Sequence, residues 1–324
     1  MIQATVLDKL CSIKIPPLFT VVETVHFVDK FKEICQNNTS ISRINLDFSQ
    51  TNFMDSSGIG TLVVCQKIAQ KKKIKLVLTH VSAPVMMALS LTALDKVFRI
   101  ENPQAEANQP GARQNTAQMM ATHPSINSRA KRLIDIVGAL VGLSITAVLF
   151  LPIALAITLD NPGPIFFRQE RCSWLGSRFK IWKFRSMVAN AEALKSQVEN
   201  QVDGPLFKNE NDPRVTRVGG VLRKLSLDEL PQFWNVLKGE MSLVGTRPPT
   251  PSEMEAYEIS QWQRLDVKPG MTGEWQVNGR STVKSFEDVI KMDLDYQENW
   301  SLVYDIKLII KTFAVIFDKK SGAM

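Results

Sequence analysis

Histidine is missing from the second half of this sequence. The three histidines, His26, His80 and His123, all precede residue 128. Any chemistry located after that point must therefore use carboxylates, lysines, hydroxyls or a metal ion. Cysteine is also rare, and none of the four cysteines has CxxC spacing. This argues against a zinc site or a disulfide framework and favours reduced thiols in a cytosolic compartment.

The amino-terminal segment lacks a basic stretch followed by an apolar run. We therefore expect no cleaved signal peptide and a first domain that stays in the cytosol. The 324 residues suffice for two domains, and 44% hydrophobic with 22% charged residues is typical of globular proteins. The net charge of +7 favours an anionic partner, whether nucleic acid, a phosphorylated substrate or an acidic membrane surface.

Helical and strand patterns alternate in the first part of the chain. Apolar residues at helical spacing predict a helix from Val21 to Cys35, and the alternation of Ile44, Leu46 and Phe48 predicts a strand. The same reasoning predicts three later elements, which are a helix after the DSSG turn, a strand at 74–80 and a helix at 82–100. Strands that alternate with helices indicate a small α/β domain, which we place at residues 1–101.

An uncharged apolar run opens the second half. It follows residues 102–127, which are rich in Gln, Asn, Ala and Pro and predict a flexible linker before a second domain at 128–324. The run from Ile136 to Leu159 contains about 24 residues. At about 1.5 Å per residue it reaches about 36 Å, enough to cross a hydrocarbon core of about 30 Å. A buried helix of a soluble protein is the alternative, but the length favours membrane contact.

Three features favour a hairpin that enters and leaves one leaflet over a helix that crosses the membrane. Pro152 stands within the run, where it removes a backbone hydrogen bond. Basic residues flank both ends of the run and draw both flanks to the cytoplasm. The first domain is itself expected in the cytosol. We therefore predict a re-entrant hairpin at about residues 133–159 in a monotopic protein of the cytoplasmic membrane, with both domains facing the cytoplasm.

A basic and aromatic run, FRQERCSWLGSRFKIWKFRSM, follows the apolar run. Such a run is typical of nucleic-acid sites or of membrane surfaces, and the neighbouring hairpin favours the membrane and no nucleic acid. Near the carboxyl end, residues 302–317 place apolar side chains on one helical face. This amphipathic helix is about equally consistent with a position in the membrane interface and with packing in a core.

Several sequence blocks follow one another between Ser128 and Phe317: KRLIDIVGA, PGPIFFRQER, KIWKFRSM, DPRVTRVGGVLRKLSLDELPQFWNVLKGEMSLVGTRP, VKPGMTGEWQVNGR and DLDYQENWSLVYDIK. In this order they resemble the bacterial sugar transferases, which are small monotopic phosphoglycosyl transferases. The resemblance implies a mostly α-helical domain with a re-entrant membrane helix. Two positions depart from the usual pattern: Leu151 precedes Pro152 where many members have serine, and Thr246 replaces a proline.

The resemblance also implies a reaction. A phosphosugar is transferred from a UDP-sugar to a polyprenyl (undecaprenyl) phosphate in a Mg²⁺-dependent step that releases UMP. This step is the first membrane step of polysaccharide or glycoconjugate assembly. The alternative, from a different class of function, is a membrane-tethered regulatory adapter with an inactive transferase half.

Two adjacent carboxylates, Asp228 and Glu229, lie in the longest of these blocks. Neighbouring helical residues point about 100° apart, so one carboxylate can reach a phosphorus while the other holds a metal. We predict that Asp228 attacks the β-phosphorus to form an aspartyl phosphosugar and that Glu229 binds Mg²⁺, which neutralises the phosphate charge. Arg223 and Arg247 are predicted to hold diphosphate oxygens through their planar guanidinium groups. The structural alternative is a helix start capped by Ser226, with both acids in its first turn.

Four further residues are candidates for the substrate site. Lys183 and Arg185 lie in the basic and aromatic run, where contacts to phosphate compete with contacts to lipid headgroups. Arg280, in VNGR, and Asp293 are candidates because they match the family's motifs alone.

The stretch INLDFSQTNFMDSSGIGTLV and the strand and helix after it resemble STAS domains, the fold of anti-sigma-factor antagonists. In that family a serine that follows aspartate is phosphorylated, which makes Ser56 the candidate phosphorylation site. The structural alternative is that Asp55 to Gly58 simply form a helix amino terminus. The resemblance also implies a homo-oligomer or a protein partner bound through this domain.

Overall fold

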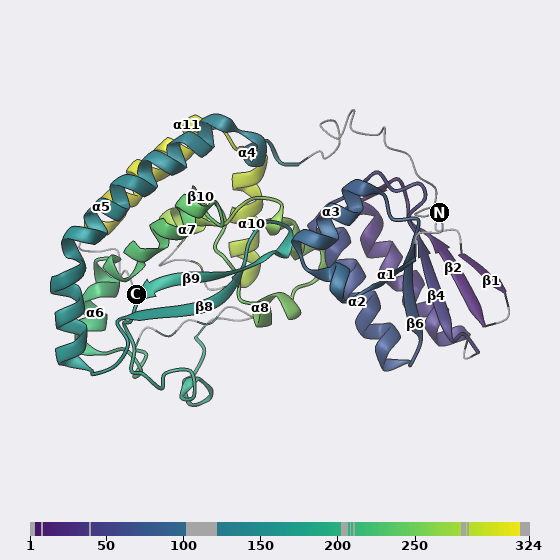
Figure 1. The fold of residues 1–324 in the computed structure, drawn as a ribbon, viewed down its shortest axis with the longest axis horizontal. Coiled ribbons are helices and arrows are strands. Elements are labelled where there is room, and N and C mark those ends of the chain that lie inside the picture. The colour runs from purple at the N-terminus through teal and green to yellow at the C-terminus, as the bar shows by residue number, and fades with distance from the viewer. Residues whose placement is uncertain are drawn as a thin grey trace. The chain divides into compact units, whose positions relative to one another are not determined.

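The computed structural model describes residues 4–317, apart from residues 8, 39, 102–121, 202–206, 208, 210, 280–282 and 284. Most of the predicted linker therefore lies outside the described residues. The chain divides into two compact units (Figure 1). The first contains residues 1–122, 175–177 and 257–266, and the second contains residues 123–174, 178–256 and 267–324.

The first unit is built on a five-stranded sheet with the order β1-β2-β4-β6-β7. The strands are β1 (Ala4–Leu7), β2 (Leu10–Lys14), β4 (Arg43–Asp47), β6 (Lys75–Thr79) and β7 (Arg99–Glu101). β1 runs antiparallel to β2, and the other neighbours are parallel. A separate parallel pair joins β3 (Leu18–Phe19) to β5 (Phe53–Met54). The alternation that predicted β4 buries Ile44 and Leu46, as one covered face of a strand requires.

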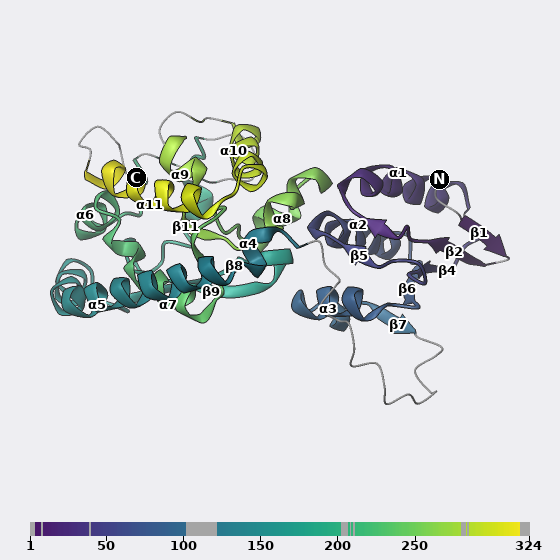
Figure 2. The same ribbon diagram turned by 90° about the horizontal axis from the view of Figure 1, so that it is seen from above.

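The helices of the first unit are α1 (Val21–Asn37), α2 (Ser56–Lys71) and α3 (Ala83–Leu91). α1 and α2 pack side by side, as both ribbon views show (Figures 1 and 2). The predicted helices near 21–35 and after the DSSG turn are confirmed, but the helix predicted at 82–100 is too long. It ends at Leu91, because Thr92 donates its hydroxyl to the Ala88 and Leu89 carbonyls and Ala93 has a φ of 57°. A 3₁₀ turn, η1 (Leu94–Lys96), and strand β7 follow.

A further 3₁₀ helix, η6 (Ile259–Leu265), belongs to the first unit although it comes late in the sequence. It packs on α1 and α2. Asp266, directly after η6, accepts a hydrogen bond from the backbone nitrogen of Ser56 at 3.0 Å. Burial, together with the negative charge of Asp55, raises the pKa of Asp266 to about 7, although hydrogen bonds from Ser56 oppose the shift. Burial also raises the pKa of Asp55, with a smaller contribution from Glu23.

The titration of Asp266 predicts that the folding stability of the first unit decreases as the pH rises. An unfolded aspartate has a pKa of about 3.9, so between about pH 4 and 7 the folded state binds more protons than the unfolded state. We expect stability on the order of a few kcal/mol to be present at low pH and lost through this window. Hydrogen exchange of residues 257–266, corrected for the chemical exchange rate, should show stronger protection at pH 5 than at pH 8. Asp266→Asn should flatten this dependence, and equal protection of the wild type at both pH values would contradict the assignment.

The second unit is mainly helical. Its α-helices are α4 (Pro124–Asn127), α5 (Arg129–Asp160), α6 (Arg217–Lys224), α7 (Phe233–Lys238), α8 (Pro251–Glu255), α9 (Glu274–Asn278), α10 (Phe286–Glu298) and α11 (Leu302–Phe317). Its 3₁₀ helices are η3 (Trp174–Gly176, shared with the first unit), η4 (Lys195–Gln197) and η5 (Leu227–Gln232). Its strands form two pairs: antiparallel β8 (Phe166–Cys172) with β9 (Arg178–Phe184), and parallel β10 (Ser242–Val244) with β11 (Gly270–Thr272).

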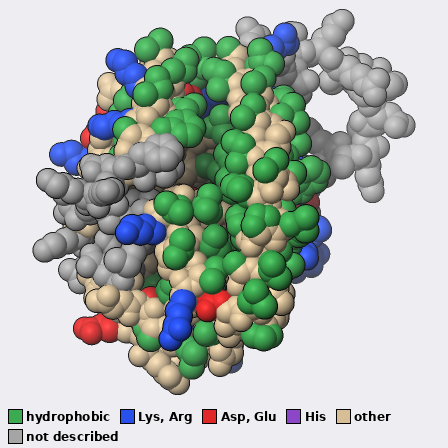
Figure 3. Space-filling model, turned by 90° about the vertical axis from the view of Figure 1, so that its left-hand side faces the viewer, with side chains coloured by type: hydrophobic (Ala, Val, Ile, Leu, Met, Phe, Trp, Pro, Cys, Tyr) green, Lys and Arg blue, Asp and Glu red, His purple; other side chains and the backbone are tan. Residues whose placement is uncertain are grey.

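Helix α5 contains the apolar run and is long and apolar enough to cross a membrane by its length and composition. It is assigned as one helix of 32 residues with Pro152 inside, and it changes direction along its length (Figure 1). Large apolar side chains on its outer face are exposed, including Val148, Leu151, Leu155 and Leu159. The face of the molecule that contains this helix is largely apolar (Figure 3). These features fit a membrane contact, and the re-entrant path stays a prediction.

The inner face of α5 packs on the elements that carry the predicted site. Ile153 and Ile157 join Phe184 and Leu222 in one buried cluster, against which Leu230 also packs. Nearer the helix start, Gly142 lets Phe233 approach so closely that a Cβ at this position would lie 2.3 Å from Cδ2 of the ring. The elements η5 and α7 are therefore held directly against the apolar helix.

Helix α11 supports both interpretations of its amphipathic pattern. Leu308 is buried in a cluster with Val244 and Tyr296, which is the behaviour of a core helix. Val303, Ile306, Ile310 and Phe313 are exposed. One side of the helix thus packs in the unit while the other presents an apolar surface to its surroundings.

Candidate active site

Asp228 and Glu229 lie on the 3₁₀ helix η5, not at the start of an α-helix. Ser226 precedes η5 with a φ of 53°, and its side chain makes no capping hydrogen bond. The alternative in which Ser226 caps a helix is therefore wrong. Successive residues of a 3₁₀ helix point about 120° apart, so the two carboxylates diverge. Asp228 is 6% exposed, whereas Glu229 is half-buried.

Two predicted cations surround this pair. Lys183, on β9, donates to Oε1 of Glu229 at 2.7 Å. Arg223, in the last turn of α6, donates its Nε–H to the hydroxyl of Ser186 at 2.9 Å. The charges of Lys183 and Arg223 both act on Asp228. The structure therefore brings four predicted site residues together from β9, α6 and η5.

The environment of Asp228 opposes its ionisation overall. Burial raises the pKa of this carboxyl, and the negative charge of Glu229 raises it further. The positive charges of Lys183 and Arg223 lower it again but do not cancel the effect of burial. A carboxyl group that is desolvated and flanked by cations is a suitable nucleophile for an anionic phosphorus centre, because the cations attract the same anion.

Arg247 lies just after β10 and belongs to a second group of charges. Its guanidinium donates to Oε2 of Glu253 on α8 at 3.1 Å. Arg171, on β8, donates to the Pro248 carbonyl at 2.9 Å, and its Nε is buried without a hydrogen-bond partner among the described residues. Burial and the neighbouring charge of Arg247 lower the pKa of Arg171 to about 10, although Glu253 opposes the shift. Two guanidiniums close enough to repel each other favour an anion between them.

The sequence analysis missed Arg171 and Glu253. Arg171 stands in the block PGPIFFRQER, so a signal was available, but that block offers a second arginine, Arg168, with equal claim. The structure separates them, since Arg168 lies over the ring of Trp182, with 4.1 Å between its Cζ and the ring centroid. The spacing of Thr250 and Glu253 is a capping-box signal that was available in the sequence, but it indicates a helix start and not a contact with Arg247.

Arg185, Asp293 and Arg280 are the remaining candidates for the substrate site. Arg185 is buried and donates to the side chain and carbonyl of Asn161 and to the Pro162 carbonyl, so its guanidinium holds the chain just after α5. Asp293 is buried on α10, which packs against α9. Arg280 lies outside the described residues. The substrate roles of these three residues stay predictions.

The donor set around Asp228 fits one kind of metal. The described residues contain no group of three or more His, Cys, Asp or Glu side chains arranged to hold a metal ion. Mg²⁺ in phosphate chemistry is typically held by one or two carboxylates, with substrate phosphates and water as its other ligands. Glu229 supplies such a carboxylate, although Lys183 occupies one of its oxygens. The residues thus fit a Mg²⁺ that takes most of its ligands from substrate and water.

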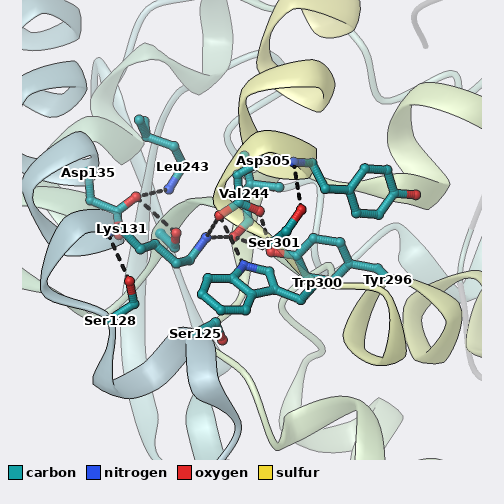
Figure 4. A network of polar contacts seen from close by, with 12 residues as sticks. Ser125, Ser128, Lys131, Asp135, Leu243, Val244, Tyr296, Trp300, Ser301 and Asp305 are labelled. Carbon is teal, nitrogen blue, oxygen red and sulfur yellow. Dashed lines mark hydrogen bonds and ion pairs between the residues drawn. The ribbon is translucent and has the colours of Figure 1, made fainter.

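A buried polar network joins the start of α5 to the rest of the second unit (Figure 4). Lys131 donates to Asp305 at 2.6 Å and to the Val244 carbonyl at 2.9 Å. Asp305 also accepts from the hydroxyl of Tyr296 at 2.8 Å and from the indole of Trp300 at 3.1 Å. One turn further on, Asp135 accepts from Ser242 and from the backbone of Leu243. The network fixes α5 to β10 and α11.

Ser56 lies in the first unit and is fully buried. Asp55 caps α2 by accepting from the Gly58 backbone at 2.9 Å, so the structural alternative for this motif is confirmed. The hydroxyl of Ser56 donates to the carbonyl of Trp262 at 2.6 Å. Phosphorylation of Ser56 stays a prediction, and it would require this hydroxyl to become accessible.

Comparison with protein families assigns both halves. The model described as "Bacterial sugar transferase" matches residues 126–319, and the STAS domain model matches residues 2–107. The chain belongs to the bacterial sugar transferase family. Its N-terminal part is a STAS domain with an α/β fold, and the adjacent carboxylates Asp228 and Glu229 fall within the sugar transferase part.

Curated relatives of this sugar transferase match its second half. It is 48% identical to "Galactosyl transferase CpsE" of Streptococcus agalactiae over 58% of this chain and 42% of that protein. It is 43% identical to "UDP-galactose-lipid carrier transferase" of Erwinia amylovora, over 60% of this chain and 41% of that protein. It is 42% identical to "UDP-glucose:undecaprenyl-phosphate glucose-1-phosphate transferase" of Escherichia coli, over 61% of this chain and 42% of that protein. The chain thus spans about two fifths of the length of these relatives.

Proposed function

We propose that this protein transfers a phosphosugar from a UDP-sugar to a membrane polyprenyl phosphate and releases UMP. The observation that carries the proposal is the buried Asp228, flanked by Glu229, Lys183 and Arg223 in a chain of the sugar transferase family. The names of the relatives, which include a galactose-lipid carrier transferase and a glucose-1-phosphate transferase acting on undecaprenyl phosphate, support this reaction class.

In the first step a carboxylate oxygen of Asp228 attacks the β-phosphorus of the UDP-sugar. The new bond joins the Asp228 oxygen to phosphorus, and the bond that breaks joins this phosphorus to the oxygen that leaves with UMP. An aspartyl phosphosugar results. Lys183 and Arg223, whose charges act on Asp228, would reduce the repulsion between the attacking carboxylate and the diphosphate.

In the second step an oxygen of the polyprenyl phosphate attacks the same phosphorus. The bond to Asp228 breaks, the carboxylate is released, and polyprenyl-diphosphate-sugar forms. The acceptor phosphate is already ionised near neutral pH, so the step needs no strong base. This agrees with a site composed of carboxylates and cations.

The leaving nucleotide needs cations of its own. We assign Arg247 and Arg171 to the diphosphate on the nucleotide side, because Arg171 donates to the carbonyl of Pro248, which directly follows Arg247. Glu253 forms an ion pair with Arg247 at 3.1 Å. Glu229 would hold Mg²⁺, which when bound neutralises phosphate charge and polarises the P–O bonds. For this, Lys183 must exchange its contact with Glu229 for one with substrate phosphate.

The contact of η5 with α5 supports a position of the site at the membrane surface. η5 contacts this helix directly, since the hydroxyl of Thr146 reaches the Leu230 carbonyl at 3.4 Å. A re-entrant α5 that dips into the cytoplasmic leaflet would hold Asp228 at headgroup level, where the lipid phosphate and the soluble nucleotide-sugar meet. Pro152 supports this path because it removes one backbone hydrogen bond within the apolar run.

The test supplies the full-length protein in lipid nanodiscs with undecaprenyl phosphate, Mg²⁺ and a panel of UDP-sugars that includes UDP-galactose and UDP-glucose. We expect UMP release with at least one donor. Without the acceptor, intact-protein mass spectrometry should show an increase equal to one phosphosugar. If the folded protein released no UMP from any donor of the panel, the proposal would be rejected. A membrane-tethered STAS adapter with an inactive transferase half would then be favoured.

A further inference from the structure

Residues 257–266 are assigned to the sugar transferase family by sequence but pack with the STAS domain in the structure. The family model covers them within residues 126–319, whereas they belong to the same compact unit as residues 1–122. Within that unit η6 lies on α1 and α2. The transferase sequence thus contributes a segment that the STAS domain holds.

Residues 257–266 contact α2 through two hydrogen bonds and through close packing of one side chain. Ser56 donates its hydroxyl to the Trp262 carbonyl at 2.6 Å and its backbone N–H to Asp266 at 3.0 Å. One turn further on, Gly60 lies under the indole of Trp262, and a Cβ at this position would approach ring atom Cδ2 to 2.6 Å. The absence of a side chain at Gly60 therefore allows the ring to lie on the helix backbone.

The segment is packed rather than loosely laid on the surface. Trp262 and Leu265 are buried, and Arg264, which is 1% exposed, donates to the hydroxyl of Tyr257 at 2.7 Å. A buried guanidinium bonded within so short a segment fixes its shape. The segment has the properties of a bound peptide that is covalently part of the same chain.

One end of the segment leads to a residue that binds Arg247, and the other leads to a residue that binds its neighbour, Thr246. On its amino-terminal side the chain comes from α8, where Glu253 pairs with Arg247 at 3.1 Å. On its carboxyl-terminal side it enters β11, where the Gly270 backbone donates to the carbonyl of Thr246 at 2.8 Å. Thr246 directly precedes Arg247 in the chain. Movement of the segment would therefore reach Arg247 from two directions.

We propose that residues 257–266 act as a tethered ligand of the STAS domain, and that their seating on α2 sets the affinity of the transferase for its nucleotide substrate. The inference rests on the proposed function for the identity of that substrate. A seated segment keeps Glu253 and Gly270 in position and so orders Arg247. A released segment leaves Arg247 disordered and weakens the site for a uridine diphosphate.

The test compares Gly60→Ala with the wild-type full-length protein in nanodiscs. The added methyl group collides with the Trp262 ring and should release the segment. We expect faster hydrogen exchange in residues 257–266 and a dissociation constant for UDP that rises about fivefold or more, in the usual range of couplings between sites. Ser56→Ala, which removes one hydrogen bond without adding bulk, should raise exchange about two- to tenfold and weaken UDP binding in proportion.

Ile44→Val is the matched control, because Ile44 is fully buried in β4 of the same unit, whereas the segment packs on α1 and α2. It should lower the stability of the STAS domain without changing UDP affinity. The inference is overturned if neither α2 variant changes exchange in 257–266, if exchange rises while UDP affinity stays constant, or if the wild type does not bind UDP. Wild-type protein that binds UDP but releases no UMP from any donor would instead overturn the proposed function alone.

Discussion

Asp228→Asn is expected to abolish transfer. An amide cannot form the acyl phosphate, so UMP release should fall by at least about a thousandfold, a typical loss when a nucleophile is removed. The mass increase expected after incubation with a UDP-sugar should disappear as well. Because asparagine has nearly the same shape and removes a buried carboxyl whose pKa is raised, the fold should not suffer. The measurements are the rate of UMP release with one UDP-sugar as donor and the mass of the intact protein.

The control for this variant is Asp288→Asn, which makes the same chemical change at an exposed position in the first turn of α10. It should retain wild-type activity. If Asp228→Asn released UMP at a rate near that of the wild type, Asp228 would not be the nucleophile. A full loss of activity with the covalent adduct retained would assign the attack to a different side chain.

Lys131→Met is expected to cause the largest loss of stability. The substitution removes the cation from a buried pair and leaves Asp305, which is 2% exposed, with an uncompensated charge. Loss of one partner of a buried ion pair costs about 3–5 kcal/mol. Thermal or denaturant unfolding in nanodiscs should show this loss. Tyr296 and Trp300 retain their hydrogen bonds to Asp305 and will limit it.

The double variant Lys131→Met/Asp305→Asn provides the control. Removal of both charges should recover part of the lost stability, since no buried charge is then left unpaired. If the free energy of unfolding of the single variant lay within about 1 kcal/mol of the wild-type value, the network in Figure 4 would contribute little to the attachment of α5. Equal losses in the single and double variants would show that packing of the lysine stem matters more than its charge.

The sequence predicted the elements whose periodicity is strong. α1 and β4 follow from apolar spacing over one face, whereas α2 and β6, which were also predicted, are buried on more than one face. The strands β8 and β9 were not predicted, because Arg168, Glu170, Arg178 and Lys180 give the pair a polar exposed side that is typical of a membrane surface or a nucleic-acid site. Along β9, however, the buried Phe179 and Ile181 alternate with the exposed Arg178 and Lys180, so the sequence did contain a strand signal.

The site was predictable only in its local part. Asp228 and Glu229 are neighbours in the sequence, and the family resemblance assigned their roles before any contact was known. The contact between Lys183 and Glu229 could not be predicted, because the two residues are far apart in the sequence, and the phosphate role of Lys183 stays a prediction. Arg185 binds the chain after α5 because Gly163, with a φ of 142°, leaves room for its guanidinium. Contacts of this kind depend on how distant segments pack, which a single sequence does not encode in any local pattern.

The bare backbone at Gly142 has a mechanical consequence. Phe233 is the first residue of α7 and packs directly on α5 there, so η5 and α7 are both held against the apolar helix. In the proposed membrane position, a bilayer of different hydrocarbon thickness would tilt this helix, and the tilt would move Asp228 closer to or farther from the plane of the lipid phosphates. Lipid chain length would then control the distance between the proposed nucleophile and its acceptor, independent of any ligand.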